Sequence, residues 1–195
     1  IIKVGSPMNE VISYYSKKIY SSSILKELSL DNDKYFLVSV HREENIDCEI
    51  NLKKFIQMLN YIANSYAIPV VVSAHPRTRK KIDSKEIKLK DNVTLIKPLG
   101  FSDYNKLQIS AKCVLSDSGT INEEASILNF RALNLRESHE RPEAMEETSV
   151  MMVGMNIQRI IQGLEIIDAQ LKGEKRTLGK VLDYSSSNVS DKIIR

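Results

Sequence analysis

Six short apolar runs, separated by stretches with helical spacing, constrain the fold of this chain more than any other feature of its sequence. Their nearly continuous hydrophobicity is typical of strands that are buried on both faces of a parallel sheet. In the stretches between them, apolar residues return every three or four positions, as on one face of a helix. Alternating strands and helices predict an α/β fold with a doubly wound parallel sheet. The runs occupy residues 35–40, 69–74, 93–99, 113–118, 131–136 and 149–154.

The helical stretches differ in length and in their start signals. The longest patterns cover residues 49–66 and 156–172. Asp103 and Ser118 are expected to cap two shorter helices, because their side chains can accept hydrogen bonds from free N–H groups of a first turn. Residues 1–19 are expected to form a strand, a glycine turn and a helix.

The organisation of the chain follows from its length and from a change in composition. The 195 residues are enough for one well-cored domain. We expect that domain over residues 1–172 and a tail over residues 173–195, where a basic turn and a serine-rich linker precede a helix start. The chain begins in an expected strand without an initiator Met, so we expect a domain of a longer protein, with a tail that packs on a part absent here.

Charge and cysteine content exclude several classes of protein. The net charge of +3 is too small to indicate a nucleic-acid partner. A basic cluster at residues 75–90 is interrupted by acids and predicts a solvated helix face. Cys113 lies in an apolar run, so a disulfide framework is not expected. Without a membrane-length apolar stretch or a signal-peptide pattern, we expect a cytoplasmic protein with no membrane partner.

Polar loops follow five of the apolar runs. Since ligands of open α/β sheets bind outside the carboxyl ends of the strands, these loops predict one common site. His75, in the loop after the second run, is expected to contribute to substrate binding. The loops read HREEN, HPRTR, LGFSDY, SDSGT and ESHERPE.

The HREEN loop offers a proton-transfer group and a cation. A histidine side chain can gain or lose a proton near neutral pH, so one at the end of a strand, such as His41, can move a proton or hold a phosphate oxygen. Arg42 can grip a diphosphate with a bidentate fork. The alternative is a loop histidine that is merely satisfied by hydrogen bonds, but its position among the polar loops favours a functional role.

The SDSGT loop has neither the Walker pattern nor the GxGxxG of a dinucleotide fold. Gly119 and Thr120 can still present backbone N–H groups at the start of the following helix, which suits a diphosphate. Glu123 and Glu124 lie one turn into that helix, where one of them can accept hydrogen bonds from a ribose diol. Equally, both can serve only to offset the helix dipole.

A third polar group lies in the sequence ESHERPEAMEE. Arg141 precedes Pro142, a residue that suits the first position of a helix, so its charge can reach the same edge of the sheet. There it can neutralise a leaving diphosphate. The alternative is a surface arginine paired with Glu140 or Glu143.

No metal or cofactor is expected. The three histidines occur singly, and no Cys/His spacing resembles a zinc site. No GxSxG elbow is present, and neither cysteine has a convincing base partner.

Three of these motifs, in this order, resemble the non-hydrolysing UDP-N-acetylglucosamine 2-epimerase family over roughly residues 35–156. HREEN is similar to its HRREN-type loop, SDSGTINEEA to its SDSGGxQEEA loop, and ERPEAMEE to its ERPEA segment. A subgroup that forms UDP-N-acetyl-L-fucosamine for bacterial capsule or O-antigen has segments that resemble three in this chain: SAHPRTRKKI, LGFSDYNKLQ and SHERPEAMEE. Thr120 stands where the family has a second glycine.

The resemblance implies a C-terminal, Rossmann-like, UDP-binding domain of a two-domain GT-B fold. It also implies a UDP-sugar substrate, a homodimeric full-length protein and a reaction by elimination and re-addition of UDP. The C2 base would lie on the N-terminal domain. By the same resemblance, Ser118 and Gly119 hold the diphosphate, Glu124 the ribose and Arg141 a phosphate, while His41 lies at the reacting sugar and Phe101 near the uracil.

Two other functions fit the same motifs. A nucleotide-sugar glycosyltransferase of the GT-B design would need an acceptor site and would turn over only with a second sugar. A domain that binds and senses UDP-sugars would show no turnover.

Overall fold

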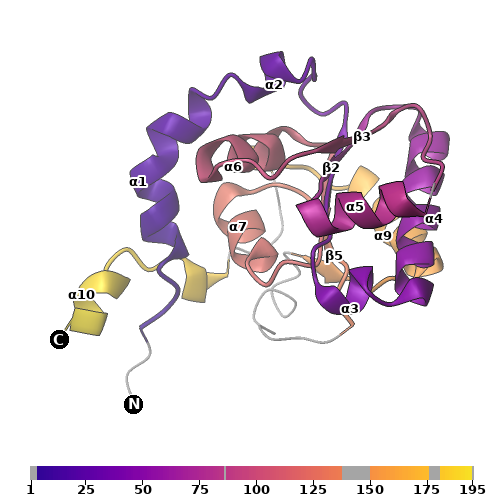
Figure 1. Cartoon of the computed structure of the whole chain (residues 1–195). Coiled ribbons are helices and arrows are strands. Elements are labelled where there is room, and N and C mark those ends of the chain that lie inside the picture. The colour runs from indigo at the N-terminus through magenta and orange to yellow at the C-terminus, as the bar shows by residue number, and fades with distance from the viewer. Residues whose placement is uncertain (1–3, 86, 138–149, 176–180, 195) are drawn as a thin grey trace.

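The six-stranded sheet lies at the centre of the computed structural model, which describes residues 4–85, 87–137, 150–175 and 181–194 (Figure 1). All neighbouring strands are parallel, and their order is β3-β2-β1-β4-β5-β6. The order reverses between β1 and β4, so this is a doubly wound sheet with its switch point there. The strands are β1 Phe36–Ser39, β2 Val70–Ser73, β3 Val93–Ile96, β4 Cys113–Ser116, β5 Ala132–Asn134 and β6 Met151–Met152.

Each predicted apolar run contains one strand, and the predicted parallel sheet is confirmed. The central pair aligns Phe36 with Cys113 and Ser39 with Ser116, so β1 and β4 end at the same level. Burial on both faces holds for β1, β2, β4 and β5 but not for the two edge strands, β3 and β6, which are partly exposed because each has a neighbour on one side only.

Two long helices cover one face of the sheet. The helices α4 (Glu49–Tyr66) and α9 (Ile157–Asp168) correspond closely to the two longest helical patterns of the sequence. Their buried side chains, including Phe55 and Leu164, pack with every second strand residue, such as Phe36, in one apolar cluster. Alternate residues of the strands and the residues on one side of each helix therefore pack together in a single core layer.

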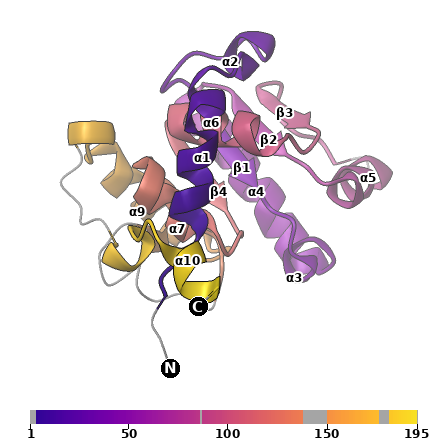
Figure 2. The ribbon, with the colours of Figure 1, turned by 90° about the vertical axis from the view of Figure 1, so that its left-hand side faces the viewer.

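The other face is covered by three shorter helices and then by a further layer. The helices α2 (Ile24–Glu27), α6 (Phe101–Ser110) and α7 (Ile121–Leu128) contribute Ile24, Leu107 and Ile121 to a second apolar cluster with the alternate strand residues. The helix α1 (Met8–Tyr20) lies outside α6 and α7 (Figure 2).

The basic segment forms α5 (Pro76–Ser84), whose charges face acids in and just after α3 (Glu43–Ile46). Nη1 of Arg77 lies 2.6 Å from Oε1 of Glu43, and Nζ of Lys81 lies 3.1 Å from Oδ1 of Asp47. All four side chains are partly exposed, so these pairs contribute little to stability. The predicted solvated face is thus confirmed, with ion pairs added.

Two expected helix caps are wrong. Asp103 lies in the first turn of α6, which begins after Gly100, and its carboxylate accepts from Ser22 Oγ instead. Ser118 lies three residues before Ile121, and Thr120 takes the N-cap position of α7. The helix α6 thus begins two residues before the polar residue expected to cap it, and α7 begins three residues after its expected cap.

The start and the tail of the chain meet beside α1. No strand forms at residues 4–6, where Gly5 has φ +86°; residues 1–3 of the expected strand lie outside the described ranges. Ser6 N–H donates to Asp183 O at 3.2 Å. Glu10 of α1 accepts hydrogen bonds from Val189 and Ser190 at the start of α10 (Val189–Ile194), which lies beside α1 in Figures 1 and 2.

The described part of the tail therefore packs on this chain itself. It contains two short 3-10 turns, Gly173–Lys175 and Leu182–Tyr184, before α10. Val181 N–H donates to Ser126 Oγ of α7, and Tyr184 packs with Ile127. The expected division into a domain and a tail that reaches a second domain stays a prediction. Among the described residues, no helix has the length and apolarity that a membrane crossing needs.

The two cysteines provide a test of the sheet. Cys48 is exposed, whereas Cys113 is fully buried in β4, where burial raises the pKa of its thiol. Because the thiolate is the reactive form, we expect Ellman's reagent to modify one thiol in the folded protein and both in urea. The Cys48→Ser variant should react only after unfolding; a fast reaction of that variant under native conditions would contradict the placement of β4.

Candidate functional site

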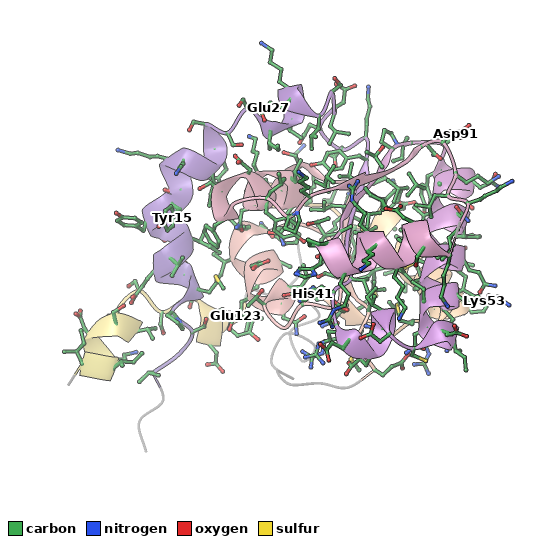
Figure 3. All side chains as sticks on the ribbon, viewed as in Figure 1. Tyr15, Glu27, His41, Lys53, Asp91 and Glu123 are labelled. Atoms are coloured by element: carbon green, nitrogen blue, oxygen red, sulfur yellow. The ribbon has the colours of Figure 1, made fainter. Side chains whose placement is uncertain are left out.

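The site is built at the switch point of the sheet, where the loops after β1 and β4 leave adjacent strands. His41 and Arg42 follow β1, and Asp117, Ser118 and Gly119 follow β4. Figure 3 shows His41 between α7 and α3, whereas Glu123 lies on the side of α7 toward the tail. The two loops that the sequence marked as polar are therefore neighbours in space.

Asp117 joins the two loops. Its carboxylate is fully buried and accepts hydrogen bonds from the backbone N–H of His41 at 3.2 Å and of Arg42 at 3.0 Å. The side-chain amide of Asn45, in α3, donates to it at 2.9 Å. A buried carboxylate is stable only with such partners. The position of the whole β1–α3 loop consequently depends on one side chain of the β4 loop.

The same carboxylate orients the imidazole of His41. Nδ1 of His41 lies 3.2 Å from Oδ1 of Asp117, and the His41 side chain is 50% exposed. The approach of Nδ1 to this carboxylate directs Nε2 away from Asp117, where it can accept a hydrogen bond when the ring is neutral and donate one when the ring is charged. His41 is therefore positioned for a ligand rather than satisfied within the loop alone.

The turn before α7 forms a chain of hydroxyl hydrogen bonds that ends on Glu124. Oγ of Ser118 and Oγ1 of Thr120 are 3.0 Å apart, and Oγ1 of Thr120 donates to Oε1 of Glu124 at 2.9 Å. A hydroxyl has one proton. Since Thr120 gives its proton to the carboxylate, Ser118 donates to Thr120, and a diphosphate that accepts from Ser118 must displace this bond.

Glu124 is almost completely buried, with 8% of its surface exposed. Its Oε2 accepts from Nε2 of Gln108, in α6, at 2.6 Å. Burial raises the pKa of the Glu124 carboxyl above its usual value, and the hydrogen bonds from Gln108 and Thr120 oppose that rise. Glu123 is also buried, so it is more enclosed than a solvated residue that only offsets the helix dipole.

His75 and His41 line a common cavity of about 230 Å³ at the ends of β1 and β2. His75 precedes α5, and its Nδ1 accepts from the backbone N–H of Arg77 at 3.3 Å, which is the role of a helix N-cap. Arg42 lies at the start of α3 with its Nη1 3.1 Å from Glu44. The other residues that line the cavity are Glu43, Ile46 and Thr78, together with Arg77.

Two further expected site residues, Phe101 and Arg141, are not among the residues that line this cavity in the described part of the chain. Phe101 opens α6 and is 36% exposed, with its ring centroid 5.4 Å from that of Tyr15 of α1. Arg141 lies outside the described residues. Neither placement tests the expected role in binding uracil or phosphate.

Sequence reasoning missed Asp117 and Gln108. Asp117 stands within the SDSGT motif, directly after a buried strand, so its need for a hydrogen-bond partner was the available signal. Gln108 gave no such signal, because one polar residue in a helix of mixed composition is ordinary. Across the described ranges, no group of three or more His, Cys, Asp or Glu residues is arranged to hold a metal ion.

The family model described as UDP-N-acetylglucosamine 2-epimerase matches residues 1–195. A solved structure of UDP-N-acetylglucosamine 2-epimerase from Rickettsia bellii is 41% identical, with a TM-score of 0.88 over 98% of this chain and 51% of that chain. The UDP-GlcNAc 2-epimerase of Methanocaldococcus jannaschii, solved in complex with UDP-GlcNAc and UDP, is 28% identical, with a TM-score of 0.85 over 98% and 53%.

A curated UDP-N-acetylglucosamine 2-epimerase of Methanocaldococcus jannaschii is 34% identical over 76% of this chain and 42% of its own length. The chain thus spans about half the length of the relatives that it matches. The structural neighbours have the GT-B fold, which agrees with the Rossmann-like domain expected from the motifs. The chain belongs to the UDP-N-acetylglucosamine 2-epimerase family.

The Asp117→Asn variant tests the junction of the two loops. Asparagine keeps one acceptor oxygen but turns an NH2 group toward N–H donors, so we expect the free energy of unfolding to fall by on the order of 1–3 kcal/mol. Urea unfolding followed by circular dichroism measures this change. Asp31→Asn, at a side chain that is 76% exposed, removes the same charge and should leave stability unchanged; equal stability of both variants would contradict the role of Asp117.

Proposed function

We propose that this member of the family is the UDP-binding half of an epimerase that inverts C2 of a UDP-N-acetyl-hexosamine. The observation that carries the proposal is the pairing, through Asp117, of the His41 loop with the Ser118 turn at the switch point of the sheet. Ligands of open α/β sheets bind at such points. The UDP-GlcNAc and UDP in the Methanocaldococcus jannaschii relative support the same ligand class.

In this proposal, the turn before α7 binds the diphosphate. Ser118 offers its hydroxyl, and Gly119 allows the phosphate to approach the backbone N–H groups at the positive end of α7. Arg42 and Arg141 supply positive charge that strengthens as the diphosphate departs. Glu124 accepts hydrogen bonds from the ribose diol.

The remaining contacts complete the nucleotide-sugar. Phe101, at the start of α6, packs on the uracil, and its exposed ring leaves room for that contact. His41 lies at the reacting sugar, with Nε2 directed away from Asp117. His75 lines the same cavity as His41 and contacts the substrate there.

The reaction is an elimination followed by an addition. A base removes the C2 proton while the bond from C1 to the UDP oxygen breaks, so UDP leaves with the electron pair and a C1=C2 double bond forms. UDP then adds back to C1, and C2 receives a proton on its opposite face. The steps need a positioned base and strong stabilisation of departing UDP; His41 and Arg141 serve the second need.

The identity of the sugar and the pathway to which it belongs are proposed from sequence motifs. The motifs SAHPRTRKKI, LGFSDYNKLQ and SHERPEAMEE resemble those of enzymes that make UDP-N-acetyl-L-fucosamine from a 6-deoxy-talose precursor. We therefore assign that product, and a place in capsule or O-antigen synthesis, to the full-length enzyme. The full-length enzyme acts in the cytoplasm as a homodimer, and its N-terminal domain supplies the C2 base.

Glu124→Gln tests the nucleotide site in this chain. We expect the chain to bind UDP, and the variant to lose on the order of 1.5–3 kcal/mol of binding free energy because a charged hydrogen-bond acceptor is removed. Binding of 2′,3′-dideoxy-UDP should change little, since that ligand lacks the diol. Calorimetry with both ligands measures the two affinities.

The control for this experiment is Glu165→Gln, which removes the same charge from α9 on the opposite face of the sheet and should bind as the wild type does. Equal losses for both ligands in Glu124→Gln would remove Glu124 from the ribose role. No heat with UDP for the folded wild-type chain would refute the proposed function.

Deuterium incorporation tests the reaction class. The full-length enzyme, incubated with UDP-N-acetyl-hexosamines in D₂O, should place deuterium at C2, which NMR detects. A glycosyltransferase would instead need an acceptor, and a sensing domain would leave the sugar unchanged. This chain alone should bind UDP without C2 exchange, because loss of a positioned base costs many powers of ten in rate. Exchange by the chain alone would show that the base lies on this domain.

A further inference from the structure

Gln108 connects two helices at the point where the proposed function places the ribose. It lies in α6 and is 1% exposed, and its Nε2 donates to Oε2 of Glu124, in α7, at 2.6 Å. It ends the sequence LGFSDYNKLQ, but no role was expected for it from the sequence. The bond crosses from one helix to the next inside the layer that α1 covers.

Each oxygen of the Glu124 carboxylate accepts one hydrogen bond within the protein. Thr120 donates to Oε1, and Gln108 donates to Oε2. An ionised carboxylate has about two acceptor positions on each oxygen. One position on each oxygen is therefore left, which matches the two O–H donors of a vicinal diol.

The two donors come from different elements, so together they fix the plane of the carboxylate. Thr120 is the N-cap residue of the same helix as Glu124, and its bond alone would leave the carboxylate free to turn about that oxygen. Gln108 holds the second oxygen from another helix. We infer that Gln108 is a positioning residue that orients Glu124 for bidentate recognition of the ribose diol, an inference that rests on the proposed function.

The unpaired end of the Gln108 amide supports a role beyond packing. In the described part of the chain, its buried Oε1 has no hydrogen-bond partner. Burying an unsatisfied acceptor is costly, and an apolar residue of the same shape would avoid that cost. The favourable feature of a glutamine at this place is the bond that Nε2 makes to Glu124.

The same bond favours the form of Glu124 that the diol needs. Burial raises the pKa of Glu124, whereas donation from Gln108 stabilises its ionised form. An ionised carboxylate accepts from both hydroxyls, but a protonated one places an O–H among those donors. Gln108 therefore acts on both the orientation and the charge of Glu124.

Gln108→Met tests this inference, because methionine is unbranched, of similar length and lacks the donor. Calorimetry of the full chain should show UDP binding weakened about tenfold, with the affinity for 2′,3′-dideoxy-UDP unchanged. The matched control is Ser126→Ala, which removes a buried hydrogen bond of α7 to Val181 without touching Glu124. The control should leave the ratio of the two affinities as in the wild type.

The outcomes separate the inference from the function on which it rests. If the wild type binds UDP in preference to the dideoxy ligand and Gln108→Met keeps that preference, the inference is wrong and the function stands. Equal weakening of both ligands would make Gln108 structural and overturn the inference as well. Absence of UDP binding by the wild type would refute the proposed function itself.

A measurement on the unaltered protein covers the case in which the variant does not fold. In ¹H–¹⁵N spectra, the side-chain amide signals of Gln108 should shift on addition of UDP and stay in place with 2′,3′-dideoxy-UDP. Signals that respond equally to both ligands, or to neither, would overturn the inference.

Discussion

The buried carboxylate of Asp117 is the interaction on which the site depends. It takes hydrogen bonds from two consecutive backbone N–H groups and from the Asn45 side chain, and it lies 3.2 Å from Nδ1 of the His41 ring. Taking a carboxylate out of water is unfavourable unless such donors replace its hydration. The loop after β1 therefore has one favourable position relative to the loop after β4, and the imidazole of His41 is fixed by the same group.

The core explains why the two loops arrive together. β1 and β4 are adjacent, fully buried for most of their length and paired to their last residues, so their ends cannot slide relative to one another. The residues after Asp117 carry a second chain of hydrogen bonds, from Ser118 through Thr120 to Glu124 and Gln108. A rigid sheet thus supports two adjacent polar networks on the β4 loop, one reaching the β1 loop and the other reaching α6, and preorganisation of this kind is what a binding site requires.

The sequence predicted the elements that follow from periodicity and failed where side-chain partners decide. The six runs located every strand that the structure describes, and α4 matches its predicted range, because burial on a sheet imposes a regular pattern. Asp103 and Ser118 were wrong as caps, since the choice between neighbouring polar residues depends on which side-chain contact each one makes instead. For Ser118, that contact is Thr120; for Asp103, it is Ser22.

The site was predicted as a set of loops but not as a network. The order of the strands brings His41 and Ser118 together, as the motifs indicated, and His75 shares a cavity with His41. Asp117 and Gln108 escaped prediction because their importance lies in contacts between residues 72 and 16 positions apart, which no local pattern records.

A UDP titration of the ¹⁵N-labelled chain, followed by backbone amide shifts, tests whether the nucleotide binds at the switch point of the sheet. Binding at this place predicts that the largest shifts fall in both loops, at His41 and Arg42 and at Ser118 to Thr120, with the same midpoint. Shifts confined to one loop, or centred on the edge strand β6 and α9, would contradict it.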